Sequence, residues 1–157
     1  YYKSFFIIFV IVIFCVFFYF YENKFKNNIT SPKPIVLKLL TSVHPSLPWS
    51  FKPVKSEVTI NPGEVTSIEY IVENLSDEAT SGIATFAYYP KQFGNFISKL
   101  NCFCYDAQTL KSKQKDSYNI VLLIDPEVTK DSKTKNIKEV TIQFTFFNFK
   151  DYKKNES

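Results

Sequence analysis

Glu139–Phe149, with the sequence EVTIQFTFFNF, alternates apolar and polar side chains. Successive side chains of an extended strand point to opposite faces of a sheet, so residues two positions apart share a face. The apolar side chains are Val140, Ile142, Phe144 and Phe146, and the polar side chains between them are Thr141, Gln143 and Thr145. The pattern predicts a strand with one face in a hydrophobic core and the other face in water.

Other apolar runs of strand length precede this one and are separated by turn residues. We expect these strands at 35–43, 58–60, 65–74, 83–89, around Cys102 and at 117–125. Asn61-Pro62-Gly63-Glu64 predicts a hairpin between two of them, because proline fixes φ and glycine accepts a positive φ. From Ile35 onward, no long segment spaces its apolar residues with the period of an α-helix. About seven short strands predict an all-β, immunoglobulin-like β-sandwich.

Three segments predict irregular structure, at 44–49, 90–100 and 126–138. Trp49 is the only tryptophan, and we expect it to plug one end of the sandwich, with a binding role as the alternative. The segment 90–100 is compatible with one turn of helix that buries Phe93, Phe96 and Ile97.

The N-terminal run Phe5–Phe20 contains no charged residue. With the flanking tyrosines it approaches the ~20 residues that cross a bilayer, so residues 1–21 are predicted to form a transmembrane helix. A signal peptide is the alternative, but its apolar core is shorter and ends at small residues. Residues 22–34 are polar and are predicted to form a tether. Residues 35–150 are predicted to form the sandwich domain, and residues 151–157 a frayed tail.

The formal charge is +4, and all 19 basic residues are lysines scattered along the chain. No cluster of arginines and stacking aromatics is present, so the composition argues against a nucleic-acid partner. With an apolar N-terminal run, partners are expected at a membrane instead.

Cys102-Phe103-Cys104 carries the clearest chemical signal in the chain. On an extended strand the two sulfurs would face the same side, where they could hold one soft metal ion. Structural zinc and iron–sulfur clusters require about four ligands, and outside the apolar run the chain offers these two thiols and His44. Cu(I), or a site shared by two chains, fits best. The alternative is that both cysteines are small buried hydrophobic residues, since Cys-x-Cys is a short motif.

Several landmarks occur in a fixed order along the soluble part. They are Leu47-Pro48-Trp49-Ser50-Phe51-Lys52-Pro53, Pro62-Gly63-Glu64, Pro90 with Gly94, Phe96 and Lys99, Cys102-Phe103-Cys104, Gln108-Thr109-Leu110, Ile124-Asp125-Pro126-Glu127 and Thr145-Phe146-Phe147. In this combination the chain resembles the CtaG-type cytochrome c oxidase assembly proteins, a copper chaperone family of mitochondria and proteobacteria.

The resemblance implies a single-pass protein of the mitochondrial inner membrane, with its domain in the intermembrane space, or of the bacterial inner membrane, with a periplasmic domain. It implies that Cys102 and Cys104 bind Cu(I), received from an upstream copper metallochaperone, for the copper B site of cytochrome c oxidase subunit 1. It further implies a homodimer when copper is bound and no catalysed reaction.

Two positions depart from the family pattern. Tyr105 stands where members usually carry phenylalanine, and residues 22–34 lack the cysteine that members commonly have between the membrane span and the first strand. Cys15 lies within the apolar run and does not replace it. A thiol relay through that position is therefore not predicted for this chain.

The residues around the motif lead to further expectations. A disulfide between Cys102 and Cys104 would close a small strained ring, so we expect the pair to resist bridging. Phe103 is expected to anchor the strand in the core. Lys99 is a candidate for lowering the pKa of the thiols by its charge. The plainer alternative is that Lys99 is a solvated lysine without this role.

The alternative function is a membrane-tethered interaction domain that binds no metal. A thiol oxidoreductase is disfavoured, because such enzymes normally space their thiols Cys-x-x-Cys at a helix N-terminus. His44 is expected to be a loop histidine, with a third copper ligand as the alternative. Asp125 and Glu127 are expected to end a strand and begin a turn, with a docking surface as the alternative.

Overall fold

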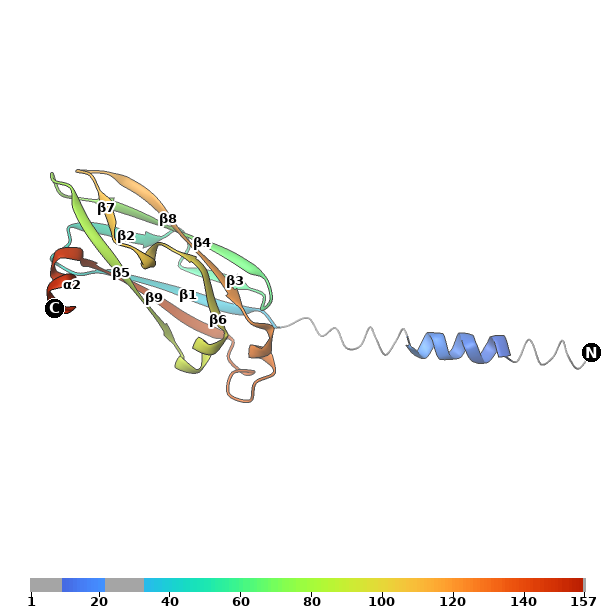
Figure 1. Ribbon diagram of the computed structural model, residues 1–157. Coiled ribbons are helices and arrows are strands. Elements are labelled where there is room, and N and C mark those ends of the chain that lie inside the picture. The colour runs from blue at the N-terminus through green and yellow to red at the C-terminus, as the bar shows by residue number, and fades with distance from the viewer. Residues whose placement is uncertain (1–9, 22–32, 157) are drawn as a thin grey trace, which may run out of the picture. The chain divides into compact units, whose positions relative to one another are not determined.

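The computed structural model describes residues 10–21 and 33–156 of the chain. The chain divides into two compact units, Tyr1–Ser31 and Pro32–Ser157. Residues 10–21 of the first unit form a helix, coloured blue in Figure 1. Within the described residues, no helix has both the length and the apolar character needed to cross a membrane. The remainder of the predicted transmembrane helix, and nearly all of the predicted tether at 22–34, lie outside the described residues.

The second unit is a sandwich of two sheets (Figure 1). The five-stranded sheet has the order β3 (Glu57–Ile60), β1 (Ile35–Val43), β9 (Glu139–Asn148), β5 (Thr80–Tyr89), β7 (Gln108–Leu110). The four-stranded sheet has the order β2 (Trp49–Pro53), β4 (Val65–Asn74), β8 (Lys115–Ile124), β6 (Ile97–Cys102). Neighbouring strands are antiparallel except β1 and β9, which are parallel. The all-β prediction is confirmed, and the two sheets are consistent with an immunoglobulin-like sandwich.

Strand β9 lies in the middle of its sheet, between β1 and β5. Its alternate residues Val140, Ile142, Phe144 and Phe146 are all fully buried. The predicted alternation is therefore confirmed, and these side chains form the centre of the core. The Phe146 ring lies 4.9 Å from that of Phe51 on the opposite sheet, in an edge-to-face arrangement that aromatic pairs favour.

Trp49 closes one end of the sandwich, as predicted. It is 5% exposed, and its ring centroid lies 5.1 Å from that of Phe146. Its indole Nε1–H donates to the Thr80 hydroxyl at 2.7 Å, which satisfies the only polar atom of the side chain. The predicted irregular segment is shorter than expected, because Trp49 itself begins β2.

The predicted hairpin at Asn61–Glu64 is wrong. The turn forms, and Gly63 has a φ of 92°, but β3 before it pairs with β1 while β4 after it pairs with β2 and β8. The Gly63 amide donates to the Ile124 carbonyl at 2.7 Å, which ties the turn to the end of β8. The segment therefore carries the chain from one sheet to the other.

The other two irregular segments each contain a short 3-10 helix. In η1 (Lys91–Phe96) Phe93 is fully buried, and Phe96 and Ile97 are partly buried, as the sequence predicts. Asp125 precedes η3 (Pro126–Thr129), and its carboxylate accepts from the Glu127 amide at 2.9 Å. The expected strand end and turn are present there.

The chain end differs from the predicted frayed tail. Helix α2 (Phe149–Glu156) follows β9 directly. The Asn148 side-chain oxygen accepts from the Lys150 amide at 3.0 Å, and the Tyr152 ring lies 6.4 Å from that of Phe147. A local hydrogen bond and an aromatic contact on the outer face of β9 thus support the helix.

Candidate metal centre

The Cys-Phe-Cys motif lies where the chain passes from one sheet to the other. Strand β6 is an edge strand of the four-stranded sheet and β7 is an edge strand of the five-stranded sheet. The 3-10 turn η2 (Phe103–Tyr105) connects them. The motif therefore lies at a side of the sandwich, between two strand edges.

The geometry of the two cysteines differs from the prediction. Cys102 ends β6, and Cys104 lies within η2, so strand alternation does not place both sulfurs on one face. The turn brings the two Cα atoms to 5.1 Å, against roughly 6.6–7 Å for two fully extended residues, and the sulfurs are joined in a disulfide. The expectation that ring strain keeps the pair from bridging is wrong in this structure, because the turn holds the two Cα atoms at a separation that is ordinary for a disulfide.

Phe103 points into the core between the two cysteines, as predicted. It is 9% exposed, and its ring lies 4.8 Å from that of Phe144 and 5.4 Å from that of Tyr118. Its contacts reach β8 and β9, which belong to different sheets. The backbone that carries the sulfurs is consequently fixed to both layers of the sandwich.

Each sulfur has one polar hydrogen close to it. The Cys104 amide donates to Cys102 Sγ at 3.2 Å, and Lys99 Nζ lies 3.9 Å from Cys104 Sγ. The Lys99 ammonium also lies over the rings of Phe86, at 4.6 Å, and Tyr105, at 5.4 Å. Partial burial lowers the pKa of Lys99. Lys99 is thus not a freely solvated lysine, and its effect on the thiols stays a prediction.

Two further side chains fix the motif, and the sequence interpretation gave neither a role. Gln108 Nε2 donates to the carbonyls of Phe103, at 3.1 Å, and Asp106, at 3.2 Å. The Tyr105 hydroxyl donates to the Lys99 carbonyl at 2.8 Å. Gln108 was visible in the sequence only as one of the ordered landmarks. The Tyr105 hydrogen bond requires the phenolic hydroxyl, which a phenylalanine at this position would lack.

The described residues offer the sulfurs no further metal ligand. No group of three or more histidine, cysteine or acidic side chains occurs in that part of the chain. His44 is occupied elsewhere: its Nδ1 lies 2.9 Å from the Ser46 hydroxyl, and its ring lies 5.7 Å from that of Phe147. Cys15 is a free, exposed thiol on the helix over residues 10–21. Once reduced, Cys102 and Cys104 form a two-sulfur donor set, which suits Cu(I) better than zinc.

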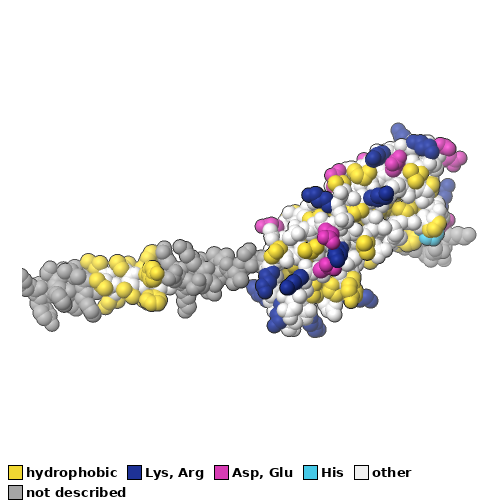
Figure 2. Space-filling model, turned by 180° about the vertical axis from the view of Figure 1, so that it is seen from behind, with side chains coloured by type: hydrophobic (Ala, Val, Ile, Leu, Met, Phe, Trp, Pro, Cys, Tyr) yellow, Lys and Arg dark blue, Asp and Glu magenta, His cyan; other side chains and the backbone are white. Residues whose placement is uncertain are grey.

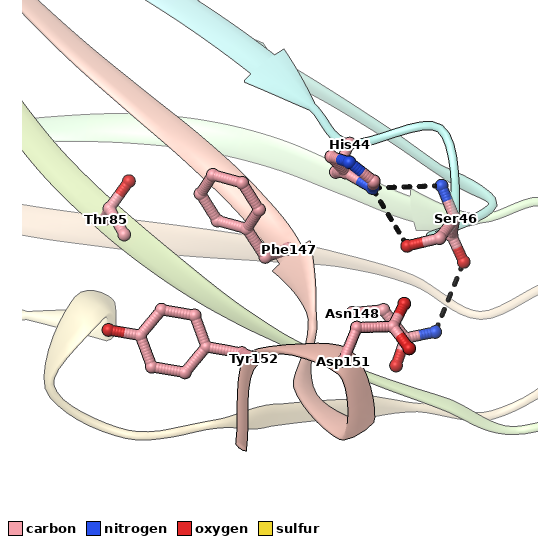
Figure 3. Close-up of a pocket in the computed structure, with 7 residues that line it drawn as sticks. All are labelled: His44, Ser46, Thr85, Phe147, Asn148, Asp151 and Tyr152. Carbon is pink, nitrogen blue, oxygen red and sulfur yellow. Dashed lines mark hydrogen bonds between the residues drawn. The ribbon is translucent and has the colours of Figure 1, made fainter. Parts of the chain in front are cut away.

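A cavity of about 420 Å³ lies beside α2, and Figure 3 shows the residues that line it. It is lined by His44, Ser46, Thr85, Phe147, Asn148, Asp151 and Tyr152. His44 and Ser46 are hydrogen-bonded there, but among the described residues no hydrogen bond links Asp151 to His44. The cluster therefore lacks the aligned relay of a hydrolytic triad.

Charged side chains of both signs share the face of the molecule that Figure 2 presents, where lysine and acidic side chains are interspersed. Three ion pairs occur among the described residues, Lys38–Glu139, Lys113–Asp77 and Lys130–Glu127, and all three are exposed. Such pairs contribute little to stability.

Comparison with known proteins places the chain in a family. Residues 13–148 match the family described as Cytochrome c oxidase assembly protein CtaG/Cox11. The chain belongs to this family. Relatives named Cytochrome c oxidase assembly protein CtaG occur in Bradyrhizobium diazoefficiens (33% identity over 119 residues, 76% of this chain and 56% of the relative), Brucella ovis (36% over 125, 80% and 62%) and Brucella canis (37% over 115, 73% and 57%).

This CtaG/Cox11-family chain therefore spans between 56% and 62% of the length of these relatives. Among solved structures, a PapD-like domain of human CEP192 aligns with 75% of this chain and 85% of its own, at 13% identity and a TM-score of 0.31. That likeness is too low to support an argument. The matched region of the family includes the whole sandwich and the Cys-Phe-Cys motif.

Proposed function

We propose that the chain is a copper carrier in cytochrome c oxidase assembly, which binds Cu(I) through Cys102 and Cys104 and delivers it to the copper B site of oxidase subunit 1. The observation that carries the proposal is the pair of adjacent sulfurs on a fixed turn at the edge of the sandwich. The family membership and the oxidase assembly names of the relatives support it.

The chemistry requires the reduced pair. A thiol reductant supplies two electrons and two protons, which break the sulfur–sulfur bond and leave two thiols. Cu(I) then displaces both thiol protons, and the resulting bis-thiolate site has a net charge of −1. A site with only two ligands leaves the metal open to an incoming ligand, so copper can pass to an acceptor by ligand exchange without being released.

The two sulfurs differ in accessibility. Cys102 is 5% exposed, whereas Cys104 is partly exposed in the turn. An incoming ligand would therefore approach from the Cys104 side. This asymmetry allows one sulfur to hold the ion from inside the sandwich while the other is exchanged.

The remaining functional assignments follow from the same proposal. An upstream copper metallochaperone loads the site, a second copy of the chain completes the copper coordination as a homodimer, and no reaction is catalysed. Residues 1–21 anchor the chain in the mitochondrial inner membrane with the sandwich in the intermembrane space, or in a bacterial inner membrane with the sandwich in the periplasm.

The test is a Cu(I) titration of the full chain in detergent micelles, reduced and kept free of oxygen. We expect one high-affinity Cu(I) per one or two chains, with a sulfur-only, low-coordinate shell by X-ray absorption. Cys102→Ser and Cys104→Ser should each abolish this binding, while Cys15→Ser, which also removes one thiol, should not. Unchanged copper binding in Cys102→Ser would refute the site, and absence of Cu(I) binding by the wild type would favour the metal-free interaction domain.

A cellular measurement tests delivery separately. Cells whose only copy carries serine at both positions should assemble oxidase that lacks copper B, seen as lost oxidase activity with subunit 1 present. Full metallation of the oxidase in these cells would remove the delivery role even if the purified chain binds copper.

A further inference from the structure

Strand β6 contains an irregularity next to the cysteine motif. Ile97 pairs with Ile124 and Lys99 with Leu122, but the register then shifts, so that Asn101 pairs with Val121 and Cys102 with Ile120. Leu100 is the extra residue, and it is 53% exposed. This is the pattern of a β-bulge, in which two residues of one strand oppose one residue of its partner.

The bulge changes the direction of Lys99 relative to Cys102. In a regular strand, residues three apart point to opposite faces. Here Lys99 opposes Leu122 and Cys102 opposes Ile120, and both partners are buried inner-face residues of β8. The single extra residue therefore places Lys99 and Cys102 on the same inward face of the sheet.

Among the residues that the structure describes, those around Lys99 supply aromatic rings and sulfur and no carboxylate partner. Its ammonium lies 4.6 Å from the Phe86 ring centroid on the opposite sheet and 3.9 Å from Cys104 Sγ. Within the described part of the chain, none of the ion pairs involves Lys99. The Tyr105 hydroxyl bonds the Lys99 carbonyl at 2.8 Å and holds the tyrosine ring beside the same ammonium. A partly buried cation has thus been brought to the motif without a counterion.

We propose that Lys99 is a positioning residue of the copper site, which the bulge at Leu100 directs at Cys104 so that its charge stabilises the anionic bis-thiolate complex. This inference rests on the proposed copper function. It assigns a role to a residue that is not a ligand. Bulges next to functional sites commonly re-aim a side chain in this way.

The charge balance gives the physical reason. Two thiolates and one Cu(I) carry a net charge of −1, and the Lys99 ammonium makes the cluster neutral. A neutral cluster is less costly to hold at a partly buried position than an anion without a partner. The Cys104 amide already donates to Cys102 Sγ, so each sulfur has one donor when Lys99 is present.

The experiment compares Lys99→Leu with the wild type by competition for Cu(I) against a chromogenic Cu(I) chelator, using the reduced full chain in detergent micelles. Leucine keeps an apolar side chain against Phe86 and Tyr105 but carries neither a charge nor a sulfur that Cu(I) could bind. We expect about tenfold weaker Cu(I) binding, the size typical of losing a half-buried charged hydrogen bond. Lys99→Arg should restore most of the affinity, and Lys133→Leu, at an exposed position outside the motif, should leave it unchanged.

Salt dependence separates charge from packing. Added salt should weaken Cu(I) binding by the wild type more than by Lys99→Leu, because only the wild type has the ammonium to screen. The thermal stability of the metal-free reduced chain is measured alongside, and a purely structural role would lower this stability without changing the salt dependence.

The outcomes distinguish the inference from the function on which it rests. Stoichiometric Cu(I) binding by the wild type with equal affinity in Lys99→Leu overturns the inference and leaves the copper site standing. An affinity loss in Lys99→Leu that Lys99→Arg does not reverse also overturns it. Absence of Cu(I) binding by the wild type overturns both.

Discussion

Tyr70 carries the one buried side-chain polar atom that lacks a hydrogen-bond partner in the described part of the chain. The residue is fully buried at the centre of β4, and its ring lies 5.2 Å from that of Phe51, 5.5 Å from that of Phe144 and 5.7 Å from that of Phe103. Burial raises the pKa of the phenol, so it stays neutral. Its hydroxyl has nevertheless lost its water without gaining a protein partner.

Tyr70→Phe should therefore stabilise the domain. An unsatisfied buried polar group costs about 1–3 kcal/mol, and the substitution removes it while keeping the aromatic contacts. Part of the gain is offset because the space of one oxygen atom is left empty among the rings. We expect the free energy of unfolding to rise by about 1 kcal/mol, which corresponds to a Tm increase of roughly 3–6 °C for a domain of this size.

The assay is thermal unfolding of the full chain followed by near-ultraviolet circular dichroism, with chemical denaturation for the free energy. Tyr118→Phe is the matched control, because Tyr118 pairs directly with Tyr70 across β4 and β8 but is 9% exposed. It should change Tm little at neutral pH. A lower Tm for Tyr70→Phe would refute the reasoning, since it would mean that the hydroxyl has a stabilising partner such as a buried water.

Two further predictions concern stability. Asn74 is fully buried and donates to the carbonyls of Glu78, Leu110 and Lys111, so Asn74→Ala should lower the free energy of unfolding by about 3 kcal/mol in chemical denaturation. A loss below that of Ser81→Ala, at a half-buried position, would contradict this. Burial and the charge of Asp116 raise the pKa of Tyr118 from its usual 10.0 to about 12. Above pH 10 the unfolded chain loses this proton before the folded chain does, so stability should fall as pH rises towards 12. The fall should be shallower in Tyr118→Phe, and parallel Tm–pH curves would count against the assignment.

The parts of the fold that the sequence predicted are those decided by local pattern. The alternation in β9 determines which side chains enter the core, wherever its neighbours lie. Gly63 adopts its positive φ as the turn sequence requires. The hairpin prediction was wrong because strand pairing is decided by long-range burial. A four-residue turn does not encode that β3 pairs with β1 and β4 with β8.

In the candidate site, too, the sequence predicts what local residues decide and misses what the pairing of distant strands decides. The two candidate ligands could be identified from the sequence, because cysteine chemistry belongs to the side chain itself. Their geometry could not, since the extended backbone assumed for the motif ends at Cys102 and becomes a 3-10 turn. The direction of Lys99 was equally hidden, because the bulge at Leu100 exists only relative to the partner strand β8. A residue count along β6 alone places Lys99 on the wrong face.

A site that passes a metal on must keep its backbone in place while a sulfur is attacked from outside. In this chain Phe103 supplies the first property, because its side chain is packed between the two sheets, and the hydrogen bonds of Gln108 and Tyr105 hold the backbone on either side of Cys104. Cys104 is partly exposed, so its sulfur can be attacked from outside. Because the anchoring side chain lies between the two sulfurs, opening the site by moving the turn would pull Phe103 out of the core. For the proposed copper site, exchange at Cys104 on a stationary backbone is therefore the less costly route of release.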